Sequence, residues 1–274
     1  MSLNNPNSSH FELHLTASAP EQTALQILSE HCPLSKQKLK TSMKNGAVWL
    51  ESSTGIQRIR RATKTLSASD RLHFYYDKSI QETTPPAAGL IADEAQYSVW
   101  HKPCGMYSQG TKWGDHCTIY RYVEAQLKPQ RPAFIVHRLD RSANGLIILA
   151  HSKKIAATFS EMFKKRKIQK QYTAIVEGRL KKTDLPFTIS SNIEGKDACS
   201  KIMSVQNFDE SCRLIIEIDT GRKHQIRRHM AELGHPVVGD RLYGSGKAEK
   251  DLQLQASCLS FLCPLTNKKR EYSL

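Results

Sequence analysis

One acidic residue set among cations is the first candidate for chemistry in this chain. Asp140 follows an apolar stretch and stands between Arg138 and Arg141. Nearby cations lower the pKa of a carboxyl group, so we expect this aspartate to be ionised. An ionised, partly buried carboxylate serves as a nucleophile or a base. The alternative is an aspartate that caps a turn and pairs with its neighbours.

A second candidate is the basic segment Gly221–His229, which joins an expected strand to an expected helix. The first turn of a helix attracts anions through its free amides and its dipole, so this segment predicts anion binding. Arg227 lies next to the apolar Ile226, so it is expected to point partly inward. A buried arginine needs an acidic partner. Asp140 is a candidate for that partner, although the spacing of the two residues does not show the contact. The alternative is a solvated basic face.

The elements that must position these residues follow from hydrophobic periodicity. Strands are expected over Phe134–Leu139 and Gly145–His151, on either side of Asp140, and over Lys170–Glu177 and Arg213–Asp219. Helices are expected over Lys153–Lys167, Lys223–Leu233 and Glu21–His31, and from Ser35 to Asn45-Gly46, with strands at 48–50 and 72–76. Because the elements do not alternate as a regular βαβ repeat, the expected class is α+β.

Several other classes of protein are excluded by the motifs. No H-E-x-x-H or G-x-S-x-G is present, and the seven cysteines include no C-x-x-C pair. We therefore expect no zinc site, and free thiols in a reducing compartment, which is typical of a cytoplasmic protein. No apolar run approaches the length of a membrane helix, so no membrane partner is expected.

The charge balance indicates a polyanionic partner. Lys and Arg number 40 against 26 Asp and Glu, which gives a net charge of +14, and nucleic acid is the commonest cellular polyanion. The cations are clustered. One cluster contains Lys36, Lys40 and Lys44, and the other contains Lys164, Lys165, Arg166 and Lys167.

A linker is expected between the two basic clusters. Residues 79–96 contain no Lys or Arg and include Pro85-Pro86, which stiffens the chain and removes two amide donors. The expected organisation is a disordered leader over 1–10, a small domain over 11–78, the linker, and a larger domain over 97–274.

Four strings in the larger domain resemble the motifs of the RluA family of RNA pseudouridine synthases, and they occur in the family's order. They are Trp100 to Gly105, His137-Arg138-Leu139-Asp140-Arg141 with Gly145-Leu146-Ile147, Lys170-Gln171-Tyr172, and Gly221 to Arg227 followed by Gly234 to Asp240. The smaller domain is similar to an S4-like RNA-binding module through Leu34 to Leu39, Lys44 to Val48, and Ser69 to Leu72.

The resemblance implies a pseudouridine synthase fold, with a mixed and largely antiparallel sheet around a central cleft. It implies isomerisation of specific uridines in structured RNA, with ribosomal RNA favoured and tRNA second, by a monomer without a metal or a cofactor. Asp140 would be the catalytic carboxylate, which attacks sugar or base or promotes glycal formation. Arg227 would pair with it, and Tyr172 would stack near the flipped uracil and assist loss of the C5 proton.

The resemblance also implies residues that contact RNA. They are Arg138, Arg141, Arg222 and His224 around the cleft, together with Lys36, Lys40, Lys44, Lys164, Lys165, Arg166 and Lys167 on the basic clusters. The competing hypothesis is a non-catalytic RNA-binding or ribosome-assembly protein that keeps the fold. The joint presence of Asp140, Tyr172 and Arg227 favours the enzyme.

Overall fold

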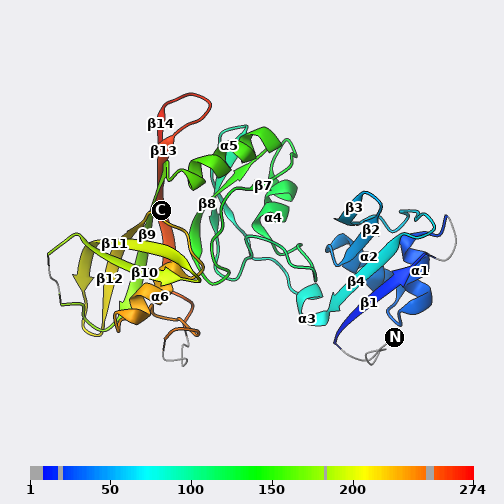
Figure 1. Ribbon diagram of the computed structural model, residues 1–274, viewed down its shortest axis with the longest axis horizontal. Helices are drawn as coiled ribbons and strands as arrows, with labels where there is room; N and C mark the ends of the chain where they lie inside the picture. The colour runs from blue at the N-terminus through cyan, green and yellow to red at the C-terminus, as the bar shows by residue number, and fades with distance from the viewer. Residues whose placement is uncertain (1–8, 18–20, 182–183, 245–249) are drawn as a thin grey trace. The chain divides into compact units, whose positions relative to one another are not determined.

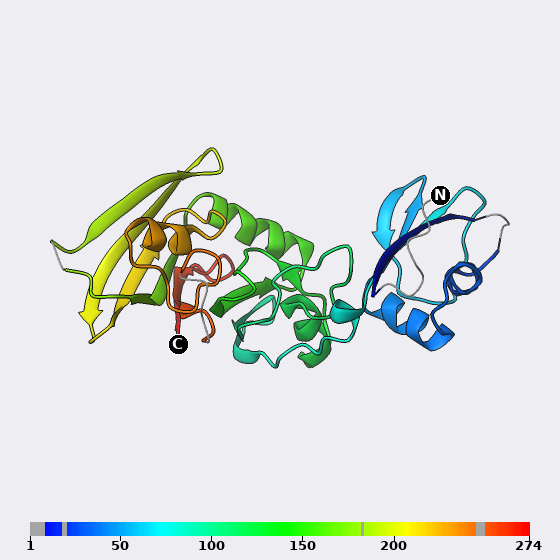
Figure 2. The same ribbon diagram turned by 90° about the horizontal axis from the view of Figure 1, so that it is seen from below.

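The computed structural model describes residues 9–17, 21–181, 184–244 and 250–274. The chain forms two compact units, which Figures 1 and 2 show from two directions. The first unit comprises Met1–Pro85 and Gln109–Tyr122, and the second comprises Pro86–Ser108 and Val123–Leu274. The segment Gln109–Tyr122, which the sequence places in the larger domain, thus belongs to the first unit.

The first unit is built on an antiparallel sheet in the order β1-β4-β2-β3. Its strands are β1 (His10–Thr16), β2 (Val48–Ser52), β3 (Gly55–Arg58) and β4 (Arg71–Asp77), and its helices are α1 (Ala24–His31), α2 (Lys36–Lys44) and α3 (Lys78–Gln81). Thr23 and Gln26 form a capping box on α1. The predicted cap at Ser35 and the stop at Gly46 (φ +82°) are confirmed.

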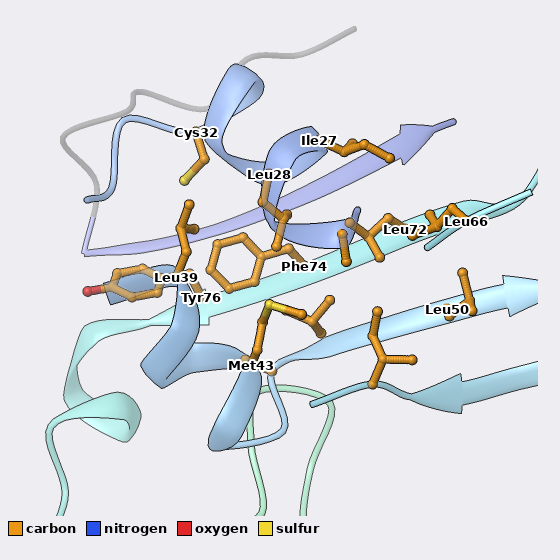
Figure 3. Packing of buried hydrophobic residues seen from close by; sticks show 14 of the residues in the cluster. Ile27, Leu28, Cys32, Leu39, Met43, Leu50, Leu66, Leu72, Phe74 and Tyr76 are labelled. Carbon is orange, nitrogen blue, oxygen red and sulfur yellow. The ribbon is translucent and has the colours of Figure 1, made fainter. Parts of the chain in front are cut away.

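One face of this sheet carries the core of the first unit. Alternate residues of β4, namely Leu72, Phe74 and Tyr76, are buried, and Figure 3 shows them packed beside Leu28 and Met43 of the helices. Side chains alternate across a strand, so His73 and Tyr75 lie on the opposite face.

The segment Gln109–Tyr122 is tied to this unit through a buried aspartate. Asp115 accepts hydrogen bonds from Arg58 (3.1 Å), Arg60 (2.6 Å) and the Tyr120 hydroxyl (2.5 Å). Burial raises the pKa of Asp115, but the bonds from Arg60 and Tyr120 outweigh it, so that the pKa lies below its ordinary value. The carboxylate is therefore a charged anchor for the segment.

The second unit is built on one long sheet, whose path is β10-β11-β12-β9-β13-β8-β6-β5, with β14 paired to β13 and β7 to β8. The strands are β5 (Gly89–Asp93), β6 (Tyr97–Lys102), β7 (Phe134–Ile135), β8 (Asn144–Ala150), β9 (Ile168–Glu177), β10 (Phe187–Ile193), β11 (Lys196–Asn207), β12 (Ser211–Ile218), β13 (Leu254–Leu262) and β14 (Lys269–Ser273). The helices are α4 (Ile119–Gln126), which begins in the first unit, α5 (Lys153–Lys164) and α6 (Gln225–Glu232). The α+β class, with a largely antiparallel sheet, is confirmed.

The pairing of β8 with β13 is parallel, whereas the other pairings in this sheet are antiparallel. Gly145 (φ +120°) lies so close to β13 that an added Cβ would meet the backbone N and O of Ala256 at 2.4 Å. Only glycine fits at this position. It joins β8, which follows the Asp140 loop, to the half of the sheet that carries β9 and β12.

Some expected boundaries are wrong. The strand expected over Phe134–Leu139 ends at Ile135, because side chains rather than a neighbouring strand bind the backbone that follows. The expected linker over 79–96 contains most of α3 and all of β5. Residues 1–8 of the expected leader lie outside the described residues, as does Pro20, which precedes the helix expected from Glu21. His10 already belongs to β1, a strand that the sequence prediction missed.

Candidate active site

A buried lysine fixes the loop that carries Asp140. Lys102 ends β6 and is fully buried, and its Nζ donates to the carbonyls of Ala143 (2.7 Å), Met106 (2.9 Å) and Pro103 (3.0 Å). Burial lowers its pKa to about 8. The Ser108 hydroxyl also donates to the carbonyl of Leu139 (2.8 Å) and accepts from its amide (3.0 Å). The residues on both sides of Asp140 are therefore held in place.

His137 packs beneath the same loop through one hydrogen bond and one ring contact. Its Nε2 accepts a hydrogen bond from the amide of Ile148 (2.9 Å), and its ring stacks on Phe163 with centroids 4.4 Å apart. Burial, with a smaller contribution from the charge of Lys170, lowers its pKa to about 3. This histidine is thus a neutral structural residue.

We expect His137 to stay neutral at pH 5, with its proton on Nδ1. The unfolded chain binds a proton at this histidine near pH 6.5 and the folded chain does not, so this group reduces stability as the pH falls from 6.5 towards 3. Imidazole ¹⁵N NMR shifts, followed from pH 7 to 5, measure the ionisation directly. A titration of His137 with a midpoint near 6.5 would contradict the prediction.

Asp140 itself lies at the wall of a cavity, with its side chain 28% exposed. Its Oδ2 is 3.6 Å from Nη1 of Arg227, and its Oδ1 is 3.9 Å from Nε2 of His224. The structure thus brings together the aspartate and the arginine that the sequence paired.

The main partner of Arg227 is a residue that the sequence reasoning missed. Nε and Nη2 of Arg227 donate to the two carboxylate oxygens of Asp240 at 2.7 Å each, and the Asp240 side chain is fully buried. Asp240 also accepts from the amides of Leu242 and Tyr243. Burial raises the pKa of Asp240, but the bonds from Arg227 and these amides outweigh it and keep it below the ordinary value. Two-pronged pairing of this kind fixes the direction of the guanidinium.

Tyr243 fixes the other neighbour of Asp140. Its hydroxyl accepts from Nε of Arg228 (3.0 Å) and lies 3.0 Å from Nδ1 of His224. The hydroxyl can therefore donate its own hydrogen bond to Nδ1. A neutral imidazole that accepts at Nδ1 carries its proton on Nε2, the atom nearest Asp140. Burial lowers the pKa of His224 more than the charge of Asp140 raises it, which favours the neutral ring.

Tyr172 lies on β9 and forms another part of the wall. Burial raises its pKa, and the charge of Asp140 raises it further, so that its hydroxyl stays protonated at neutral pH. Within the described chain its neighbours across the sheet are Ile216 and Ala256. The ring offers a flat apolar surface with one polar tip.

The cavity encloses about 460 Å³ of free space, part of it open to solvent. Its lining combines polar and apolar side chains. Its lining is Arg138, Leu139, Asp140, Ala143, Tyr172, Ile218, Gly221, Arg222, His224, Gln225, Ile226, Arg227 and Leu254. A site of this size and mixture suits a small planar ring with several hydrogen-bonding groups.

The other residues predicted to bind RNA are spread more widely. Arg138 is exposed and Arg222 donates to the carbonyl of Asp197 (3.0 Å), and both line the cavity. Arg141 turns away and lies over the ring of Tyr107. The remaining predicted residues are exposed and lie outside the cavity, on α2 (Lys36, Lys40, Lys44) and at the end of α5 (Lys164, Lys165, Arg166, Lys167).

The described residues contain no group of three or more His, Cys, Asp or Glu side chains arranged to hold a metal ion. Across the same parts of the chain, none of the helices has the length and apolar character needed to span a membrane.

Comparison with known proteins places this site in a family. The model of the RNA pseudouridylate synthase family matches residues 96–232, which is half of the chain. A ribosomal large subunit pseudouridine synthase D of Blochmanniella floridana is 36% identical over 166 residues, 56% of this chain and 50% of that protein. A tRNA pseudouridine synthase C of Vibrio parahaemolyticus is 29% identical over 220 residues, 68% of this chain and 89% of that protein.

The solved structure of human RNA pseudouridylate synthase domain containing 1 has the same fold. It superposes with a TM-score of 0.58 at 23% identity and covers 70% of this chain and 86% of its own. The predicted fold is confirmed by this likeness.

Proposed function

The chain belongs to the RNA pseudouridylate synthase family, and from this premise we propose that it isomerises specific uridines of ribosomal RNA in the cavity beside Asp140. The enzyme class follows from the family match. The observation that carries the choice of site is the placement of Asp140, Arg227 and Tyr172 around one cavity.

The reaction breaks the bond between N1 of uracil and C1′ of ribose and forms a bond from C5 to the same carbon. The base must first leave its stack, which costs a few kcal/mol, and it then needs a pocket that holds it while it turns. The cavity has space for such a ring, and Tyr172 supplies a flat surface against which it packs.

We assign the role of catalytic carboxylate to Asp140. Attack on the sugar, attack on the base and formation of a glycal all require an ionised carboxylate beside the nucleotide. Arg227 stands 3.6 Å from it and stabilises its charge, and the same guanidinium is available to charge that develops on the substrate. Since Tyr172 stays protonated, its hydroxyl serves better as a hydrogen-bond donor to the uracil than as a base.

We further propose that the first unit is an RNA-binding module of the S4-like kind. Four lysines of α2 are exposed, and Leu39 and Met43 of the same helix are buried, so the charged side of α2 faces solvent. None of these lysines is in an ion pair with another described residue, which leaves their charges available for phosphates.

Replacing Lys36, Lys40 and Lys44 together by Gln is expected to weaken RNA binding and to flatten its salt dependence. Each lost phosphate contact lowers the slope of log affinity against log salt by about 0.7–0.9. Affinities measured over a salt series test this. The control is a triple Gln variant of the exposed Lys196, Lys201 and Lys268, which removes the same charge. Equal slopes in the two variants would argue against a phosphate-binding role for α2.

Ribosomal RNA is the favoured substrate, because the relative with the higher identity of the two is named for the large ribosomal subunit. The test is a transcriptome-wide map of pseudouridine in cells with and without this gene. We expect one or a few sites in ribosomal RNA to lose the modification and to regain it when the wild-type gene is restored. Loss confined to tRNA would move the substrate to the second class, and an unchanged map would reject the proposal.

A further inference from the structure

The first unit has a second surface of defined shape, on the sheet face opposite its core. A hollow there encloses about 760 Å³ of free space, part of it open to solvent. It shares no residue with the cavity beside Asp140. Its lining is His14, Trp49, Glu51, Ile56, Arg71, His73, Tyr75 and Lys112, which we call the sheet-face hollow.

The aromatic walls of the sheet-face hollow are fixed in place. Nε1 of Trp49 donates to the carbonyl of Lys112 (3.0 Å), and the guanidinium of Arg58 lies 4.2 Å from the centre of its ring. Nζ of Lys112 lies 4.8 Å from the centre of the Tyr75 ring, and Trp113 packs edge-on against the same tyrosine. Rings held in this way lose little freedom when a flat ligand stacks on them.

Two histidines also line the hollow, His73 with its side chain 11% exposed and His14 with its side chain 44% exposed. His14 and His73 are paired across β1 and β4, and their Nδ1 atoms lie 2.7 Å apart, so that one donates and the other accepts. Nε2 of His73 lies 2.9 Å from Glu51. Burial lowers the pKa of His14, and the neighbouring His73 lowers it further. His14 therefore presents a neutral imidazole to the hollow rather than a further cation.

The cations stand at the rim. The side chains of Arg71 and Lys112 are 53% and 47% exposed, whereas their carboxylate partners, Glu51 and Glu12, are 37% and 33% exposed. Exposed ion pairs are weak, so both cations can exchange a carboxylate for a phosphate at little cost. The chain as a whole, with a net charge of +14, attracts polyanions.

Flat aromatic walls with cations at the rim are the arrangement by which proteins bind unpaired nucleotides. We propose that the sheet-face hollow binds one unpaired nucleobase of the substrate RNA, outside the stretch that enters the catalytic cavity. The base stacks on the aromatic rings of Trp49 and Tyr75 that line the hollow, and Arg71 and Lys112 hold its flanking phosphates. This assignment rests on the proposed function, which makes RNA the partner.

The test compares three variants of the full chain: Tyr75→Leu, Arg71→Gln and, as a control of equal charge, Arg61→Gln, whose side chain is exposed and lies outside the hollow. The probes are a fluorescently labelled single-stranded RNA of mixed sequence and a blunt RNA duplex of equal length. Affinities are measured by anisotropy at one salt concentration.

Loss of the Tyr75 ring is expected to weaken single-strand binding about tenfold and to leave duplex binding unchanged, since stacking needs an unpaired base. Arg71→Gln is expected to weaken single-strand binding more than Arg61→Gln. The proposal is overturned if Tyr75→Leu binds the single strand within twofold of wild type while its unfolding midpoint is unchanged. It is also overturned if both probes weaken equally, which would indicate a general electrostatic or folding effect.

The wild-type chain is assayed in parallel for pseudouridine formation on total RNA. A chain that binds the single strand through the hollow but forms no pseudouridine leaves this inference standing and rejects the proposed function. If the wild-type chain forms pseudouridine and Tyr75→Leu binds the single strand normally, the proposed function stands and this inference is rejected.

Discussion

Asp140→Asn is expected to abolish turnover while leaving the affinity for RNA near that of the wild type. Asparagine has the size of aspartate but no negative charge, so it cannot attack the nucleotide or balance a developing positive charge. We expect a loss of at least about 10³-fold in kcat, at the scale of groups that act directly in the chemical step. Binding should persist because exposed cations such as Arg138, to which we assign phosphate contacts, are untouched.

Release of tritium from RNA that carries [5-³H]uridine measures the turnover, and a filter-binding curve measures the affinity. The matched control is Asp209→Asn, because Asp209 is exposed and lies outside the cavity. Normal tritium release by the Asp140 variant would remove Asp140 from the mechanism. It would also revive the alternative of a non-catalytic RNA-binding protein.

Asp240→Asn is expected to destabilise the second unit more than other single changes in this site. It leaves the guanidinium of Arg227 buried without its two-pronged partner, and breaking a buried ion pair in this way costs about 3–5 kcal/mol. For a unit of this size that corresponds to a fall of about 6–20 °C in the unfolding midpoint. Because Arg227 is also released from its fixed direction, turnover should fall by about 100-fold.

A double variant separates stability from catalysis. Arg227→Met removes the buried cation, and Asn at 240 keeps an acceptor for the amides of Leu242 and Tyr243. The pair Arg227→Met/Asp240→Asn should therefore regain most of the lost midpoint and remain inactive. Calorimetry and tritium release on the three variants provide the readouts. If the double variant is as unstable as Asp240→Asn, the ion pair is not what holds this region together.

The catalytic candidates could be predicted from the sequence, whereas the residue that orients Arg227 was missed. An inward-facing Arg227 predicts an acidic partner, and the resemblance to the family identifies Asp140 as that partner. Asp240 was overlooked although the same reasoning points to it, since it ends the string Gly234 to Asp240 and is the next aspartate after Arg227. The rule that a buried arginine needs an acidic partner asks for one carboxylate, whereas the guanidinium of Arg227 faces two.

The errors in the fold also have physical causes. The alternation of Phe11, Leu13 and Leu15 indicates a strand, but the first element expected from the sequence is the helix that begins at Glu21. Val136 and Leu139 extend the apolar pattern of Phe134 and Ile135, but the Ser108 side chain, distant in sequence, binds the backbone of Leu139. Such long-range hydrogen bonds leave no periodic signal in a sequence.

The anchoring of Asp115 by Arg58 and Arg60 also bears on how this protein can be divided. A shortened protein that began at Pro86 would retain 109–122 and lose both arginines, leaving Asp115 an acid without its counter-charges. The first unit therefore cannot be added or removed, by evolution or by protein engineering, at a single point in the chain. Any exchange with a related enzyme has to carry both pieces of the chain together.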